Sequence, residues 1–126
     1  MAFIYVGVGG FLGSCLRYVL AVFFRNLGVA FPLGTLVSNV IAGLLIGFII
    51  GMERQTGLIS PQIKLFLNTG LLGGLSTFST FSLETVELFS SQRYADGVLN
   101  AFLNISLSLC GVVLGMIVAK SIFRKG

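Results

Sequence analysis

Residues 70–84 combine glycine, hydroxyl and phenylalanine side chains inside a long uncharged stretch of the chain. Lys64 is the last charged residue before this segment, and Glu84 is the first one after Lys64. Such apolar surroundings are typical of a bilayer, where broken backbone is tolerated only if it is buried in protein or lines a polar cavity. Broken helices commonly hold ions, because their freed carbonyl and N–H groups need partners. We therefore predict an ion site at mid-depth in a membrane; a flexible glycine kink in a packed helix is the alternative.

The residues that follow the glycines are spaced for two neighbouring helix faces. Thr77, Thr80 and Glu84 fall on one face, and Phe78 and Phe81 fall on the other. Hydroxyl groups can donate hydrogen bonds to an anion, and an aromatic ring presents a positive edge that does so weakly. Nothing in the sequence resembles a ring of carboxylates that would select a cation. The pattern therefore favours an anion path.

Uncharged polar residues also recur in the neighbouring apolar segments. Asn39 lies well inside the preceding one, while Asn104 and Ser108 stand one helical turn apart in the last one, with Asn100 on the same face. A polar stripe inside a membrane is a functional-site hypothesis by default. Interhelical hydrogen bonding, at about 0.6 kcal/mol per contact, explains any single one of these residues equally well. Their concentration around a broken helix favours a pathway.

Four membrane-spanning helices are expected to position these residues. The mean hydropathy is +1.02, and 10% of the residues are charged, compared with about 25% in soluble proteins. The apolar runs have about the 20 residues that a spanning helix needs. The expected helices lie near 3–24, 33–52, 62–90 and 96–121, the third being interrupted around Gly73–Thr77, in a single domain of residues 1–126. Pro32 and Pro61 are expected to open the second and third helices, and Asp96 to cap the fourth.

Composition argues against several functions. The net charge of +4 is scattered and does not form the basic face that nucleic-acid binding needs. The sequence has no histidine, and its two cysteines, Cys15 and Cys110, lie in apolar runs, which indicates neither a disulfide framework nor a cysteine metal site. Glu84 and Glu87 lack a nucleophile–base partner system, so no enzyme is expected. The first segment lacks a basic leader and a cleavage site, so we expect a helix of the mature protein rather than a signal peptide.

Glycines at four-residue spacing predict close helix contacts. They are Gly9 and Gly13; Gly43, Gly47 and Gly51; and Gly111 and Gly115. Small residues on one face let membrane helices approach closely, but the spacing leaves open whether a contact is internal or between subunits. Four short helices can scarcely enclose a conduit alone, which favours a homo-oligomer. The basic residues are nearly balanced between the two predicted sides, so orientation is weakly specified, as in a protein inserted both ways round.

These motifs resemble those of the Fluc (CrcB-type) fluoride channels. Gly73-Gly74-Leu75-Ser76-Thr77-Phe78-Ser79-Thr80-Phe81-Ser82 with Glu84 is similar to the signature of that family's third helix, and Pro32-Leu33-Gly34-Thr35-Leu36-Val37-Ser38-Asn39 resembles its second-helix motif. Gly13 through Leu16-Arg17-Tyr18 resembles its first-helix pattern. The resemblance implies an antiparallel, dual-topology homodimer with two fluoride pores. Its place would be the cell inner membrane or plasma membrane, where passive efflux relieves fluoride toxicity.

The resemblance also implies roles for individual residues. The expected fluoride pathway is Phe78, Phe81, Asn39, Ser79, Thr80, Ser108 and Glu84. In it the two phenylalanines turn their ring edges to the ion and Asn39 is a pore-lining donor, while Arg17 matches a vestibule arginine. From the residues alone, Arg17 could equally snorkel to the membrane surface. Gly73 and Ser76 would give backbone carbonyls, two from each subunit, to a structural sodium ion on the dimer axis. Asn104 stands where relatives are expected to carry Ser or His, so its part in the polar track is open.

Two other functions are kept as alternatives. A small proton-coupled multidrug-type transporter would share the length, the four helices and a possible dual topology. It should carry an acid in its first helix and tryptophan in its aromatic cages, and this sequence has neither. A non-transporting assembly subunit would explain the glycine faces but not a mid-membrane break with a polar stripe. Proton-dependent drug uptake would identify the first alternative. Absence of transport in every flux assay would favour the second.

Overall fold

The computed structural model describes residues 1–124, and every regular element in that range is a helix, which confirms the all-α prediction. The elements are α1 (Ala2–Asn26), α2 (Leu33–Thr56), α3 (Pro61–Lys64), the π-helix η1 (Leu65–Leu72), α4 (Gly73–Leu75), α5 (Ser79–Ser90) and α6 (Tyr94–Phe123). Three of them, α1, α2 and α6, are each long and apolar enough to cross a membrane. The pieces between α2 and α6 are individually too short, so a fourth span remains a prediction.

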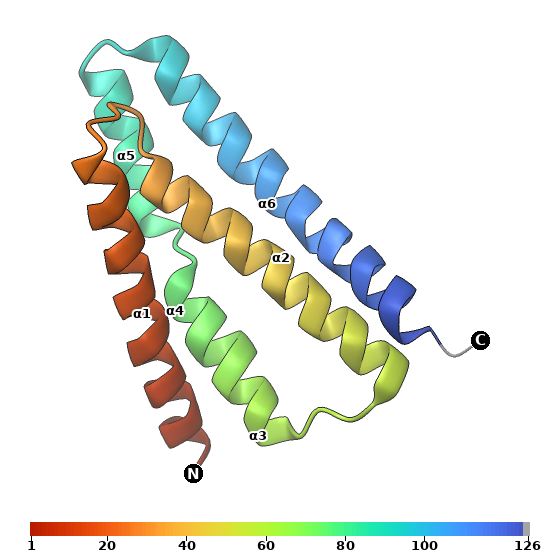
Figure 1. The fold of residues 1–126 in the computed structure, drawn as a ribbon. Helices are drawn as coiled ribbons and strands as arrows, with labels where there is room; N and C mark the ends of the chain where they lie inside the picture. The colour runs from red at the N-terminus through yellow and green to blue at the C-terminus, as the bar shows by residue number, and fades with distance from the viewer. Residues whose placement is uncertain (125–126) are drawn as a thin grey trace.

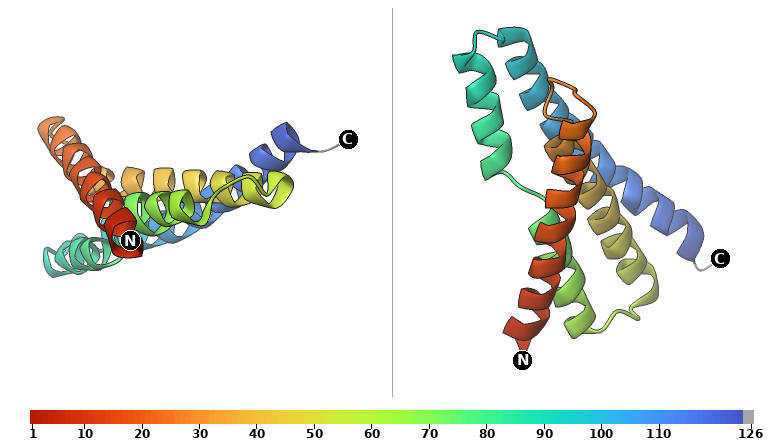
Figure 2. Two further views of the ribbon diagram at one scale, coloured as in Figure 1. Left: turned by 90° about the horizontal axis from the view of Figure 1, so that it is seen from below. Right: turned by 60° about the vertical axis from the view of Figure 1, so that its left-hand side comes forward.

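The helices run between two ends of the molecule (Figure 1). The N-terminus, the loop 57–60 and the end of α6 lie at one end, and the turns 27–32 and 91–93 lie at the other. α2 and α6 lie side by side, α1 packs against η1 and α4, and α5 packs on the start of α6 (Figure 2). Within this segment η1 and α4 contact both α1 and α2, whereas α5 contacts α6 and α2, so the hydroxyl-rich residues lie where the chain passes from the first group of helices to the second.

Of the three predicted helix starts, one is confirmed: the residues expected to begin α3 do so, and those expected to begin α2 and to cap α6 do not. Ser60 caps α3 by accepting a 3.2 Å hydrogen bond from the amide of Ile63, and Pro61 occupies the first turn, as expected. Pro32 does not open α2 but precedes it, because its ψ of 68° is outside the helical region. Asp96 does not cap α6 either.

The residue in the capping position of α6 is Arg93, and Asp96 lies within the first turn. The Asp96 carboxylate accepts hydrogen bonds of 3.0 and 2.7 Å from the Arg93 guanidinium. The Asp96 carboxylate is therefore bonded to Arg93 and not to the free backbone amides at the start of the helix. The same guanidinium donates to the carbonyl of Ala30 at 3.1 Å, which joins the two turns at this end of the molecule.

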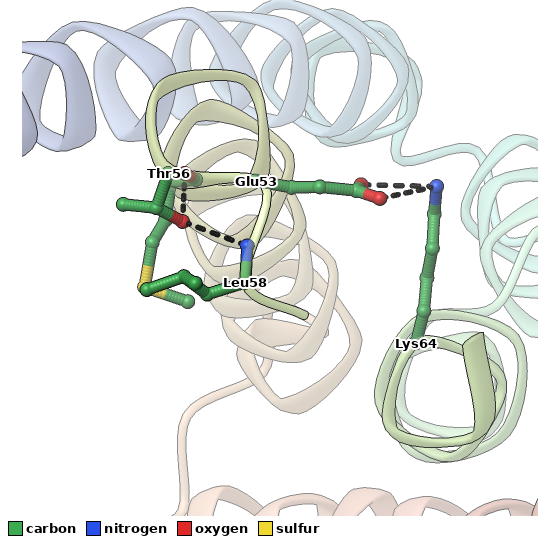
Figure 3. A network of polar contacts seen from close by, with 5 residues as sticks. Glu53, Thr56, Leu58 and Lys64 are labelled. Carbon is green, nitrogen blue, oxygen red and sulfur yellow. Dashed lines mark hydrogen bonds and ion pairs between the residues drawn. The ribbon is translucent and has the colours of Figure 1, made fainter. Parts of the chain in front are cut away.

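The end of α2 is tied to the start of the next segment (Figure 3). Gly57 ends the helix in the left-handed conformation, with a φ of 63°, which glycine adopts at little cost. Thr56 Oγ1 accepts a 3.3 Å hydrogen bond from the amide of Leu58. Lys64 Nζ lies 2.9 and 3.1 Å from the two carboxylate oxygens of Glu53. This ion pair fixes the returning chain beside α2.

The glycine stripe of α2 packs against α6 of the same chain, which answers the question that spacing left open. Gly43, Gly47 and Gly51 are all buried. A Cβ atom on Gly47 would overlap the carbonyl oxygen of Val112 and would stand 2.9 Å from its Cα. From the other side, Gly115 faces the backbone of α2 with similarly little space. The two backbones are therefore in direct contact.

Gly47→Val is expected to destabilise the folded protein by about 3 kcal/mol, because the added side chain must push α6 away along its length. The measurement is the thermal midpoint and the yield of monodisperse protein in detergent. Gly7→Val is the matched control, since a Cβ at Gly7 would meet no atom of the described residues within 4 Å. Equal losses in the two variants would contradict the close α2–α6 contact.

Candidate functional site

Between α4 and α5 the backbone leaves helical geometry at residues 76–78. Ser76 is extended, with a φ of −77° and a ψ of 152°, and the helix resumes at Ser79. Gly73 and Gly74 are themselves helical, so the interruption begins at Ser76 rather than at Gly73 as the sequence predicted. Glycine permits a break but does not impose one; here the break lies where side chains take the backbone amides.

The side-chain amide of Asn39 holds the interrupted segment. Its Oδ1 accepts a 2.8 Å hydrogen bond from the amide of Thr77, and its Nδ2 donates to the carbonyl of the same residue at 3.2 Å. The remaining Nδ2 hydrogen goes to Asn104 Oδ1 at 2.9 Å. Both amide hydrogens of Asn39 are thus used within the chain. An anion that takes a hydrogen bond from Asn39, as predicted, must displace one of these contacts.

Several backbone carbonyls lose their helical partners at the break, and those of Gly73 and Ser76 are among them. In a continuous helix the amide of Thr77 would bond to the Gly73 carbonyl and that of Thr80 to the Ser76 carbonyl. The first amide bonds instead to Asn39, and the second to Thr77 Oγ1 at 3.2 Å. Within residues 1–124, the Gly73 and Ser76 carbonyl oxygens therefore accept no hydrogen bond. Such unpaired carbonyl oxygens are the ligand type that hard cations prefer.

An open groove of about 640 Å³ lies beside the break, between α2, η1, α4, α5 and α6. The predicted site residues that line it are Asn39, Gly73, Ser76, Phe78, Phe81 and Ser108. Asn104 lines it as well, and so does Asn68, which the sequence analysis missed although it is the one amide side chain between Leu65 and Leu83. Asn68 Oδ1 and Ser108 Oγ are buried, and neither has a hydrogen-bond partner among residues 1–124. The groove thus contains polar atoms that are available to a ligand.

The two phenylalanines of the groove differ sharply in exposure. Their ring centroids are 5.6 Å apart and the rings are inclined at 59°. Phe81 is 8% exposed, whereas Phe78 is 79% exposed. Phe81 therefore contributes to the packing of this chain, while most of the Phe78 ring is free to meet an ion or a second chain.

Three other predicted residues gather in a separate recess. Arg17, Thr80 and Glu84 line a space of about 270 Å³ between α1, α2 and α5. Glu84 Oε1 accepts a 2.7 Å hydrogen bond from the hydroxyl of Thr35, and its buried Oε2 has no partner in the described part of the chain. Arg17 Nε donates to the carbonyl of Gly74 at 3.1 Å. Arg17 thus satisfies a carbonyl at the end of α4, a contact that neither sequence interpretation included.

The comparison with known proteins decides the family. Residues 4–116 match the family described as "CrcB-like protein, Camphor Resistance (CrcB)". The chain belongs to the CrcB family. It is 47% identical over 119 residues to the "Fluoride-specific ion channel FluC" of Clostridium perfringens (strain ATCC 13124), covering 94% of this chain and 93% of that protein. It is 45% identical over 125 residues to the FluC of Clostridium novyi (strain NT), covering 95% and 94% of the two chains.

A more distant CrcB-family relative is also matched nearly end to end. It is the "Fluoride-specific ion channel FluC 1" of Methanosarcina acetivorans, 37% identical over 117 residues, with 93% of this chain and 89% of the relative covered. The resemblance read from the motifs is therefore confirmed at the level of the family. The roles of individual residues remain predictions.

In this CrcB-family chain the predicted polar stripe is divided. Thr77 lies outside α5 and lines the groove, whereas Thr80 and Glu84, on α5, line the recess. The single helix face expected for these three residues was therefore wrong, because the break turns the chain between the first and the second. Ser79 is exposed and is in the lining of neither space.

Proposed function

We propose that this protein is a fluoride-selective channel and not an enzyme. It lies in the plasma membrane, which is the inner membrane in cells that also have an outer one, and it lets fluoride leave the cell passively. The observation that carries the proposal is the nearly end-to-end match to relatives named as fluoride-specific ion channels. The chain is a multi-pass membrane protein by the same relationship, and its three long apolar helices agree with this. A drug transporter is not favoured by these relatives.

The groove beside the break offers fluoride a suitable environment. Fluoride is small and strongly hydrated, and isolated charge in an apolar medium is very costly. A conducting path must replace water with partial donors, none of which binds so tightly that the ion cannot leave. The Ser108 hydroxyl and the exposed Phe78 ring edge can supply such contacts without a fixed positive charge. We assign the groove as the inner part of the fluoride path.

A second copy of the chain is proposed to complete the path. The groove of one chain is open, and four of its lining residues, Gly73, Phe78, Ile105 and Leu109, are exposed. A channel needs walls on all sides at the depth of the hydrocarbon, since lipid does not solvate the ion. An antiparallel homodimer in the bilayer, as the family resemblance implies, would close both grooves and give two pathways.

A structural sodium ion is proposed at the break. The residues fit a hard cation, because the Gly73 and Ser76 carbonyl oxygens have lost their helical partners to Asn39 and Thr77. Two carbonyls from each of two chains would provide four oxygen ligands. When bound, sodium would supply a positive charge that the partially negative carbonyl oxygens coordinate, and it would link the subunits. Asn39 and Thr77 would keep the carbonyls free, and the ion itself would stay in place.

Proteoliposomes loaded with fluoride and chloride test the proposed function. Purified protein is expected to release fluoride rapidly on addition of an ionophore that balances charge, while chloride release stays near the level of protein-free vesicles. Ion-selective electrodes measure both anions. Equal release of fluoride and chloride would remove the fluoride assignment. Flux that requires a proton gradient would point instead to the coupled transporter.

A further inference from the structure

A chain of hydrogen bonds runs in one direction from the break to α5 through α6. Asn39 Nδ2 donates to Asn104 Oδ1 at 2.9 Å, and Asn104 Nδ2 donates to Asn100 Oδ1 at 3.0 Å and to its carbonyl at 2.9 Å. Asn100 Nδ2 donates to Thr85 Oγ1 at 2.9 Å, and that hydroxyl donates to the carbonyl of Phe81 at 2.8 Å. This series of hydrogen bonds begins at Asn39, which lines the groove, and ends at the carbonyl of Phe81, which also lines it.

Backbone groups at both ends fix the direction of this chain. Asn39 must present its oxygen to the amide of Thr77, so its nitrogen is the group that faces Asn104. Asn104 must then present its oxygen to Asn39 and its nitrogen to the carbonyl of Asn100, which can only accept. Asn100 is fully buried and Asn104 is 5% exposed. Buried amides that are bonded in this way are held in one orientation, since turning the amide over would break these bonds and leave polar groups unpaired.

We propose that Asn104 is a positioning residue that competes with the passing anion for one hydrogen of Asn39. An amide nitrogen has two hydrogens, and in Asn39 one is held by the Thr77 carbonyl and the other by Asn104. Fluoride in the groove can gain a hydrogen bond from Asn39 only by displacing one of them. Asn104 thereby weakens anion binding at Asn39 and lets the ion move on. This inference rests on the proposed function of the groove as a fluoride path.

A competing account makes the asparagines simple interhelical contacts. Hydrogen bonds between membrane helices stabilise by about 0.6 kcal/mol on average and need no ligand. The two accounts differ in what happens to fluoride affinity. Removal of a structural contact lowers the amount of active protein, whereas removal of a competitor makes the site bind fluoride more tightly.

Asn104→Leu tests the proposal, because leucine is close to asparagine in size but cannot accept the Asn39 hydrogen. Fluoride efflux from proteoliposomes is measured over a range of internal fluoride concentrations. The half-saturating concentration is expected to fall about tenfold, as a hydrogen bond to a charged group becomes available. The maximal rate is expected to fall with it, because the ion leaves more slowly. Asn104→Ala provides the same deletion without added bulk if the leucine variant does not fold.

Asn100→Leu is the matched perturbation. It removes an equally buried amide from the same helix, yet Asn104 can still donate to the carbonyl of residue 100 and still hold Asn39. Its half-saturating concentration is expected to stay within about twofold of wild type, whatever happens to stability. Ser106→Ala is the neutral control, since among residues 1–124 this hydroxyl bonds only to the carbonyl of Phe102 in its own helix.

The half-saturating fluoride concentrations of these variants distinguish a competing role of Asn104 from a structural one. A lower half-saturating concentration in the Asn104 variants alone supports the proposal. An unchanged value in both Asn104 variants, or the same shift in Asn100→Leu, overturns it and leaves a structural role. Absence of fluoride efflux in the wild-type protein would instead overturn the proposed function, so the two failures are distinguishable.

Discussion

Phe78→Leu is expected to reduce fluoride efflux by about tenfold or more while the protein stays folded and keeps the oligomeric state of the wild type. The Phe78 ring is 79% exposed beside the groove, so its loss removes little packing within the chain. Leucine keeps the apolar character but has no positive ring edge to direct at an anion. Efflux is measured with a fluoride electrode on proteoliposomes, and size-exclusion chromatography with thermal melting establishes that the variant is intact.

Two further substitutions show whether the effect belongs to the groove. Phe102→Leu alters a phenylalanine that is 65% exposed on α6 and is not part of the groove lining, and it should conduct like wild type. Phe81→Leu should lower both efflux and stability, the latter by about 1.5 kcal/mol or less, because Phe81 is buried. Wild-type efflux in a well-folded Phe78→Leu protein would show that the exposed ring serves packing in the assembly rather than ion contact.

The long helices, and the faces on which they approach another backbone closely, could be predicted because their causes are local in the sequence. Runs of about 20 apolar residues specify spanning helices, and glycines four apart specify a face on which another backbone can lie. The partner of that face could not be predicted. Gly47 faces α6 of the same chain because α2 and α6 run parallel and pack along their length, and no property of the glycine spacing distinguishes this from a contact between subunits.

The position of the break depended on residues distant in the sequence. Glycines at 73 and 74 suggested that the chain unwinds there, but they are helical. The amide of Thr77 is taken by Asn39, which lies 38 residues earlier, and Arg17 bonds to the Gly74 carbonyl across 57 residues. Such partners are set by tertiary packing. For the same reason a helical wheel drawn through Thr77, Thr80 and Glu84 placed residues together that the folded chain separates.

Gly73→Val is expected to abolish efflux, whereas Ser76→Ala is expected to retain most of it. Both positions are proposed to bind sodium through backbone oxygens, which Ser76→Ala preserves. That variant loses only the 2.9 Å hydrogen bond from the hydroxyl to the Leu72 carbonyl, which contributes about 1 kcal/mol. At Gly73 a Cβ would make only an ordinary 3.5 Å contact with the Asn68 carbonyl, and the helical φ of −64° suits any residue. A severe effect of valine must therefore arise outside the isolated subunit, where a second chain and its sodium would approach.

Replacing sodium distinguishes two causes of a loss of efflux in Gly73→Val: loss of the sodium site, or a steric clash between two chains. With sodium exchanged for N-methyl-D-glucamine on both sides of the membrane, wild type and Ser76→Ala should lose efflux in parallel, and added sodium should restore both at similar concentrations. Gly73→Val should not recover.

Radioactive sodium should not move in proportion to fluoride, because the proposed ion would be held by carbonyls that Asn39 and Thr77 keep free and would not be carried. If Ser76→Ala removes the sodium dependence while Gly73→Val conducts normally, the hydroxyl rather than the two carbonyls binds the cation. Stoichiometric movement of sodium with fluoride would make the protein a coupled transporter.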